Sequence, residues 1–189
     1  MQENIALVQN GFRILLPDMA GYICRELSRV YKNGWWQEVL TALSDQYDLP
    51  SSGEYAELQD SLDVANCLRL IDRRWNDVFR SKLSKDYRTW ATELMGVRNK
   101  VAHLGMQDIA QADAERALDT MARLCDGFDS DGAEEIRALY RKLRYGSEDA
   151  STSSAPAKET TPTGKSKTVA AVLGRHVGEN LPSWRDVMQ

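Results

Sequence analysis

The chain has 189 residues, a formal net charge of −4 and 42% hydrophobic residues, which is an ordinary globular composition. It contains no run of about 18 apolar residues and no signal-peptide start, so the sequence offers no membrane-spanning or secreted segment. The cysteines, Cys24, Cys67 and Cys125, are widely spaced, which favours buried thiols in the reducing cytoplasm. The acidic balance argues against a broad phosphate-binding surface but leaves room for a small site with a few local cations.

Apolar residues recur at helical spacing from the N-terminus to about residue 145, and no segment alternates as a strand does. The predicted helices cover residues 5–16, 17–31, 35–43, 58–82, 85–103, 107–126 and 131–145. Pro17 is expected to begin a new helical segment or to kink the first one, because proline removes a backbone donor. Gly105 is expected to end helix 85–103 in the left-handed conformation. The sequence therefore predicts an all-α fold.

A change in composition divides the chain into three parts. Residues 147–168 include two of the five prolines and no aromatic residue, so they cannot bury enough apolar surface to offset the entropy of ordering. We expect a helical domain at 1–146, a flexible linker at 147–168, and a short helix with a tail at 169–189. The tail holds Leu181, Trp184 and Val187. It indicates either the start of a following domain in a longer protein or a segment that docks on the helical body.

The candidate site is the run from Arg98 to His103 on helix 85–103. Asn99 and His103 are four residues apart and share a helix face. Arg98 and His103 are about 140° apart on an ideal helix, so they converge only if the arginine wraps around or the helix loosens near His103. We expect His103 at a helix end, pointing toward Arg98 or toward the same motif in a partner chain.

These three side chains suit cleavage of RNA. A neutral histidine can take the proton of a 2′-hydroxyl, which then attacks the adjacent phosphorus. An arginine can stabilise the charge on the phosphoryl oxygens, and Asn99 can orient the imidazole or the phosphate. This chemistry needs no metal or cofactor, and the sequence has no clustered ligand set for one. The alternative is that Arg98, Asn99 and His103 satisfy a structural polar contact.

The neighbourhood of this run resembles the HEPN superfamily (higher eukaryote and prokaryote nucleotide-binding), whose mark is an arginine and a histidine separated by four to six residues. It is most similar to the Swt-type subset, in which an aromatic and acidic helix precedes the motif. The residues that carry the resemblance are Asp72, Trp75, Asp77, Val78, Phe79, Trp90, Glu93, Leu94, Val97, Arg98, Asn99, Ala102 and His103.

The resemblance implies an up-down helical bundle that is often a homodimer, with two motifs facing each other across a joint cleft. It implies metal-independent endoribonuclease activity in many members, with RNA as substrate and Arg98, Asn99 and His103 as the catalytic residues. Such domains occur at the N-termini of large ATPase or helicase-like proteins in prokaryotic phage-defence systems. Two functions therefore stay open: a defence or toxin-like endoribonuclease, and a non-catalytic dimerisation or sensing module of a larger protein.

Two further groups of side chains are weaker candidates. The first is a local basic face, although exposed helix charges are usually only solvated. Its members are Arg13, Arg25, Arg29, Arg69, Arg73, Arg74 and Arg80. The second is the pair Trp35–Trp36, which could stack on bases. Packing of one ring in the core and partial cover of the other is the simpler expectation.

Overall fold

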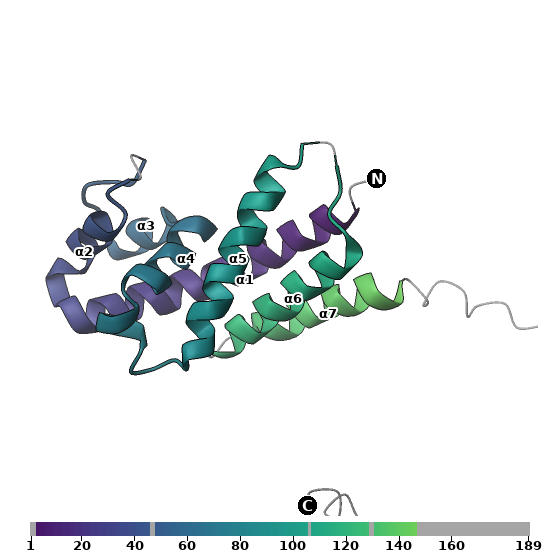
Figure 1. The fold of residues 1–189 in the computed structure, drawn as a ribbon. Helices are drawn as coiled ribbons and strands as arrows, with labels where there is room; N and C mark the ends of the chain where they lie inside the picture. The colour runs from purple at the N-terminus through teal and green to yellow at the C-terminus, as the bar shows by residue number, and fades with distance from the viewer. Residues whose placement is uncertain (1–2, 46–47, 106, 129–130, 147–189) are drawn as a thin grey trace, which may run out of the picture. The chain divides into compact units, whose positions relative to one another are not determined.

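The computed structural model describes residues 3–45, 48–105, 107–128 and 131–146, which contain helices and no strand (Figure 1). The helices are α1 (Glu3–Tyr31), α2 (Trp35–Ala42), α3 (Tyr55–Asp60), α4 (Val64–Arg73), α5 (Lys85–His103), α6 (Gln111–Asp126) and α7 (Gly132–Tyr145), with a 3₁₀ turn at Lys32–Gly34 and a π-helical turn at Trp75–Phe79. The predicted all-α fold is confirmed. The expected linker at 147–168 and the segment at 169–189 lie outside the described residues.

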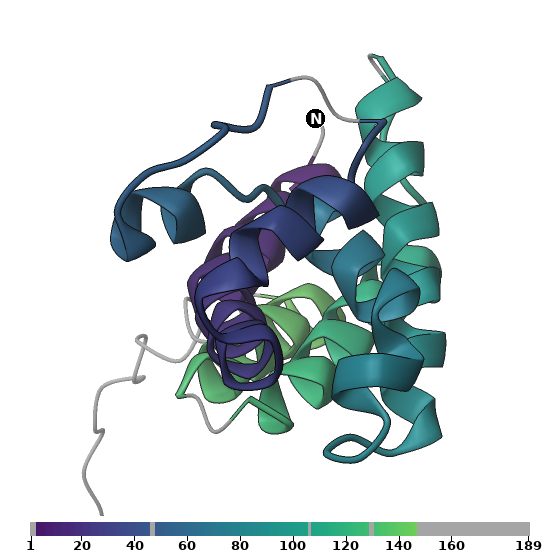
Figure 2. The same cartoon turned by 90° about the vertical axis from the view of Figure 1, so that its left-hand side faces the viewer.

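The long helix α1 is the helix on which most of the other helices pack. Viewed nearly along its axis in Figure 2, it is flanked by other helices on several sides. Its inward residues recur every three or four positions and include Ile5, Val8, Phe12, Leu15, Met19, Ile23 and Leu27, all buried. α6 packs closely on α1 at Gly11, where an added Cβ would lie 2.8 Å from atoms of Leu118 and Met121. The glycine thus sets the distance between these two helices.

Pro17 does not begin a new helical segment, because α1 continues through it as one helix. The alternative expectation, a kink at this position, stays a prediction. Pro17 lies on an exposed part of α1, between the buried residues Leu15 and Met19. A carbonyl that loses its helical partner on this side can be hydrated, so the missing donor costs less than it would in the core.

The predicted helix at 58–82 is wrong, since the structure divides it into α3, α4 and the π-helical turn. α4 begins at its own N-cap, Asp63, whose carboxylate accepts the backbone N–H of Asn66 at 2.7 Å. After α4, the N–H of Arg80 bonds the carbonyl of Trp75 at 2.8 Å, which is the five-residue spacing of a π turn. Apolar spacing alone detects neither break.

The three cysteines and the pair Trp35–Trp36 are buried. Cys24, Cys67 and Cys125 are buried thiols outside any disulfide, as predicted, and burial raises the pKa of Cys24 to about 12. Trp35 and Trp36 are both buried, so the expectation that one is only partly covered is wrong. The indole N–H of Trp36 donates to the carbonyl of Pro50 at 2.8 Å. Within the described part of the chain, no helix combines the length and apolarity needed to cross a membrane.

The loop after α5 is fixed to the first turn of α1. The carboxylate of Asp108 accepts the backbone N–H groups of Asn4 at 3.1 Å and Ile5 at 2.9 Å. Desolvation acts to raise the pKa of Asp108, but these backbone donors outweigh it and the pKa is lowered. The Asn4 amide also donates to the carbonyl of Ile109 at 2.8 Å. Because residues 108–109 serve this contact, α6 begins at Gln111 rather than at the predicted 107.

The position of α5 depends on Leu94, which is fully buried. Truncation in Leu94→Ala is expected to lower the free energy of unfolding by about 2–5 kcal/mol, because the lost apolar contacts leave a cavity. The matched control is Thr92→Ala on the exposed side of the same helix, which should stay within about 0.5 kcal/mol. Urea denaturation measures both, and equal stabilities of the two variants would contradict the assigned packing.

Candidate functional site

The motif lies on the last turns of α5. Ala91 and Leu94 fix the helix in the core, while Val97 and Val101 are partly covered. The observed helix, Lys85–His103, matches the predicted one, and Gly105 has the expected positive φ of +57°. Figure 1 shows the C-terminal end of α5 projecting beyond the neighbouring helices. The motif is therefore presented at a free-standing helix end rather than inside a cleft of the chain.

Arg98 is held between α5 and α4. Its Nη2 lies 3.6 Å from Oδ2 of Asp63, the N-cap of α4, and its Nη1 donates to Oδ1 of Asn99 at 3.4 Å. The Arg98 side chain is 39% exposed and the Asp63 side chain 56% exposed. An ion pair this exposed is worth about 0–1 kcal/mol, so a phosphate can displace the carboxylate at little cost. Asp63 was not among the predicted site residues.

Asn99 and His103 are exposed and share one face of α5. His103 is the last helical residue, as predicted, and its side chain is exposed at the end of α5. The helix does not loosen before it, so Arg98 and His103 keep an offset of about 140° around the axis and about 7.5 Å along it. Within one chain, the structure joins Arg98 to Asn99 but does not join Arg98 to His103.

A groove of about 270 Å³ lies beside the motif, between α5 and α6. Val97, Val101 and Ile109 contribute its apolar lining. Two ion pairs flank it: Lys100 with Asp113 at 2.6 Å, and Arg116 with Glu93 at 2.6 Å. The hydrogen bond from Arg116 lowers the pKa of Glu93, which keeps this carboxylate charged. The described residues contain no group of three or more histidine, cysteine, aspartate or glutamate side chains placed to hold a metal ion.

The predicted basic face is divided among separate contacts. Arg74 is structural, since it is mostly buried, pairs with Glu38 at 2.8 Å and donates to the Glu38 carbonyl at 2.9 Å. Arg73 pairs with Asp45 at 2.7 Å, and that hydrogen bond lowers the pKa of Asp45 to about 2. Both tryptophans of the pair Trp35–Trp36 are core residues and cannot stack on bases.

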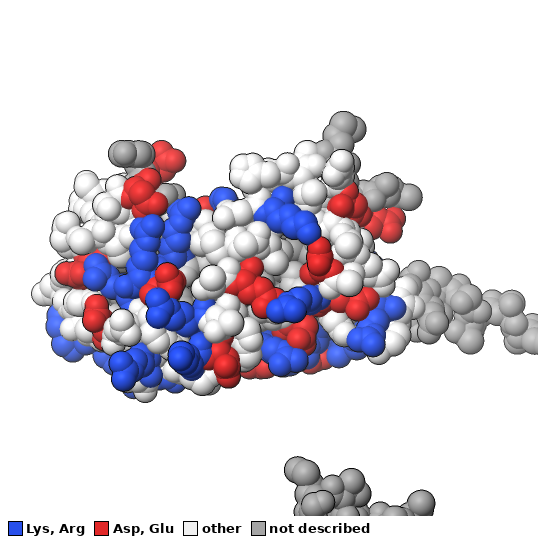
Figure 3. Space-filling view, viewed as in Figure 1, with Lys and Arg blue, Asp and Glu red and all other residues white. Residues whose placement is uncertain are grey.

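The face that carries α4 and α5 has mixed charge. In Figure 3, basic and acidic side chains are interspersed over most of it, and basic side chains gather over α4. α4 carries Arg69 and Arg73, one turn apart, and Arg98 reaches its N-terminal end. Basic side chains therefore form a small group over α4 rather than a broad positive surface, in agreement with the net charge of −4.

These features define an all-helical domain with an Arg-Asn-x-x-x-His motif at an exposed helix end. A family profile described as Swt1-like HEPN matches residues 10–129, which is more than half of the chain. The chain belongs to this family. Neither the search of curated proteins nor the search of solved structures gave a match. The matched range includes α5 and the whole motif.

Replacement of Asp63 separates its two contacts. Asp63→Ala removes the N-cap of α4 and should cost about 0.5–2 kcal/mol of unfolding free energy. Asp63→Asn keeps a capping oxygen and loses only the charge facing Arg98, so it should cost under about 0.5 kcal/mol. Thermal or urea unfolding measures the difference. An equal loss in both variants would show that the ion pair, and not the cap, is the stabilising contact.

Proposed function

We propose that this chain is an endoribonuclease domain of the HEPN type, in which His103 is the general base, Arg98 the phosphate stabiliser and Asn99 the orienting residue. The observation that carries the proposal is the intact trio on an exposed helix end within a Swt1-like HEPN domain. His103 takes the proton of a 2′-hydroxyl, and the resulting oxyanion attacks the adjacent phosphorus. The bond from phosphorus to the 5′-oxygen breaks, the leaving oxygen takes a proton from water and becomes a 5′-hydroxyl, and a 2′,3′-cyclic phosphate remains. The protonated His103 then returns its proton to the solvent.

Arg98 supports this step through its charge and its planar donors. Its guanidinium is oriented by the weak contacts to Asp63 and Asn99, and both contacts are exposed enough to exchange for a phosphate. As charge accumulates on the phosphoryl oxygens, the guanidinium can donate two parallel hydrogen bonds to them.

The nuclease is tested on single-stranded RNA in EDTA. Native protein should cut, leaving 2′,3′-cyclic phosphate ends, and His103→Ala should lower the rate by about 10²–10⁴-fold, because the general base is lost. Arg98→Lys should also lower the rate, since lysine cannot donate the bidentate pair.

The control is Lys100→Ala, an exposed cation on the same turn whose partner is Asp113. It should cut at close to the native rate. Absence of cleavage by the native chain at high concentration would contradict the nuclease proposal for this domain. Equal rates in native protein and His103→Ala would assign any cleavage to a contaminant.

We further propose that the working site is shared by two copies of the chain. Arg98 and His103 lie on different sides of α5, so a second copy is the simplest source of the missing partner for each. The exposed residues Thr89, Thr92, Gly96, Asn99 and His103 alternate spacings of three and four along α5. An added Cβ at Gly96 would meet nothing within 4 Å, so this stripe leaves room for another helix to approach closely.

Mixing two inactive variants tests the shared site. If Arg98 of one chain serves His103 of the other, a mixture of Arg98→Ala and His103→Ala should recover up to about a quarter of native activity, because half of the dimers are mixed and each holds one intact pair. Cleavage assays on the refolded mixture measure the recovery. A mixture as inactive as its components would contradict pairing between chains.

The second candidate function is a non-catalytic dimerisation or sensing module of a larger ATPase or helicase-like protein. The pairing of Arg98 with Asp63, rather than with His103, favours it. In this case the native chain sediments as a dimer, RNA remains uncut, and the motif residues contribute to association alone. A prokaryotic phage-defence or toxin-like role is compatible with either function.

A further inference from the structure

A second groove lies at the opposite end of α5 from the motif. It has a volume of about 730 Å³ and runs between α1, the turn before α5 and the turn after α6. Its charged lining residues are Arg25, Glu26, Arg29, Lys82 and Asp126. α5 has 19 residues, so this groove and His103 are separated by about 27 Å of helix.

The centre of this groove is an arginine pair held by one buried carboxylate. Glu26 is 4% exposed, and its Oε1 lies 2.9 Å from Nη1 of Arg29 and 3.7 Å from Nε of Arg25. The two arginine side chains remain 50% and 56% exposed. Each guanidinium has five N–H donors, and one carboxylate cannot use all of them. The buried acid thus orients two cations while leaving donors for a ligand.

The local charge favours an anion. Lys82 is exposed and adds a third cation, while Asp126 is already paired with Arg137 of α7. Asp86, in the first turn of α5, is the other acidic side chain near Tyr87. The groove also contains Ser84, the N-cap of α5, where the helix dipole adds partial positive charge.

The wall of the groove is rigid. Tyr87 lies so close to Gly127 that an added Cβ there would be 2.2 Å from the Tyr87 ring. On the other side, the rings of Tyr22 and Phe128 pack at 4.8 Å, and the Arg25 guanidinium lies 5.3 Å from the Tyr22 ring centre. Arg25 is therefore restrained by an aromatic face as well as by Glu26, which lowers the entropy lost on binding.

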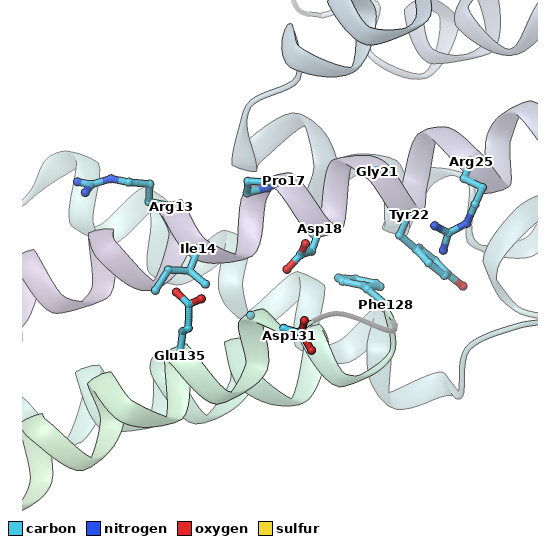
Figure 4. A pocket seen from close by; sticks show the side chains of 11 residues that line it. Arg13, Ile14, Pro17, Asp18, Gly21, Tyr22, Arg25, Phe128, Asp131 and Glu135 are labelled. Carbon is cyan, nitrogen blue, oxygen red and sulfur yellow. The ribbon is translucent and has the colours of Figure 1, made fainter.

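The adjoining pocket is lined by more acidic than basic side chains, since its cations are Arg13 and Arg25 and its acids are Asp18, Asp131 and Glu135. Figure 4 shows the carboxylates of Asp18, Asp131 and Glu135 in the space between α1 and α7, with Arg25 beside Tyr22 at one end. These acids would repel an anion there. An anion that approaches this side of the domain is thus directed to the Arg25–Arg29 side of the Tyr22–Phe128 pair.

We propose that the groove around Arg25, Arg29 and Lys82 is a second binding site, separate from the motif, for a phosphate ester. Two sources share this chemistry: the backbone of an RNA strand and the phosphate of a free nucleotide. Arginine pairs bind phosphate oxygens through parallel hydrogen bonds, and Lys82 adds a point charge. The proposal does not depend on cleavage at His103.

The test uses the full chain carrying Arg98→Gln and His103→Ala, so that the motif neither binds nor cuts. A fluorescent oligouridylate is titrated at several salt concentrations, with AMP, ATP and inorganic phosphate as competitors. Arg25→Gln with Arg29→Gln should weaken binding about tenfold or more and reduce the slope against log salt by about 2. Displacement by AMP or ATP identifies a nucleotide site, and displacement by RNA alone identifies a backbone site.

Two further variants control for misfolding and for a general loss of positive charge. Lys82→Glu leaves both partners of Glu26 in place, so it should weaken binding without disturbing the fold. Arg123→Gln with Arg141→Gln removes the same charge from exposed ion pairs on α6 and α7, and it should bind as the parent does. Equal affinity in the groove variants and this control would overturn the proposal, as would failure of every phosphate probe to bind.

Discussion

Burial of the inward side of α1 is the interaction on which the rest of the bundle depends. Each large aliphatic or aromatic side chain buried there contributes about 1.5–3 kcal/mol of transfer free energy. α1 contacts α4, α6 and α7, and the close approach at Gly11 sets the position of α6. α5 packs on α4 and α6 rather than mainly on α1. It is therefore held by its neighbours along most of its length while its last turn is left to solvent.

Where apolar spacing coincides with clear end signals, the sequence was sufficient to predict the fold. Helix 85–103 was predicted to the residue, because the periodic apolar stripe ends at Val101 and Gly105 follows shortly after it. Segment 58–82 was mispredicted, because the same stripe continues across two breaks. One break depends on the cap at Asp63 and the other on a π turn. Pro17 does not begin a new segment, because the cost of its missing backbone donor depends on how exposed that side of the helix is, which the sequence does not state.

The candidate site was predictable in its members but not in its connections. Arg98, Asn99 and His103 follow from the motif, and their helical offsets follow from regular geometry. The contact with Asp63 joins segments 35 residues apart, so only the packing of α4 against α5 brings it about. The arginine pair on Glu26 was visible as basic residues on one helix. Its shared acid and the groove at Lys82 required tertiary structure.

The cap that Asp108 places on α1 ties the beginning of the chain to the motif. The first turn of α1 and the loop after His103 share three hydrogen bonds, so neither can shift alone. A partner that binds the first turn of α1 would therefore also act on the loop that follows His103, without touching the motif itself.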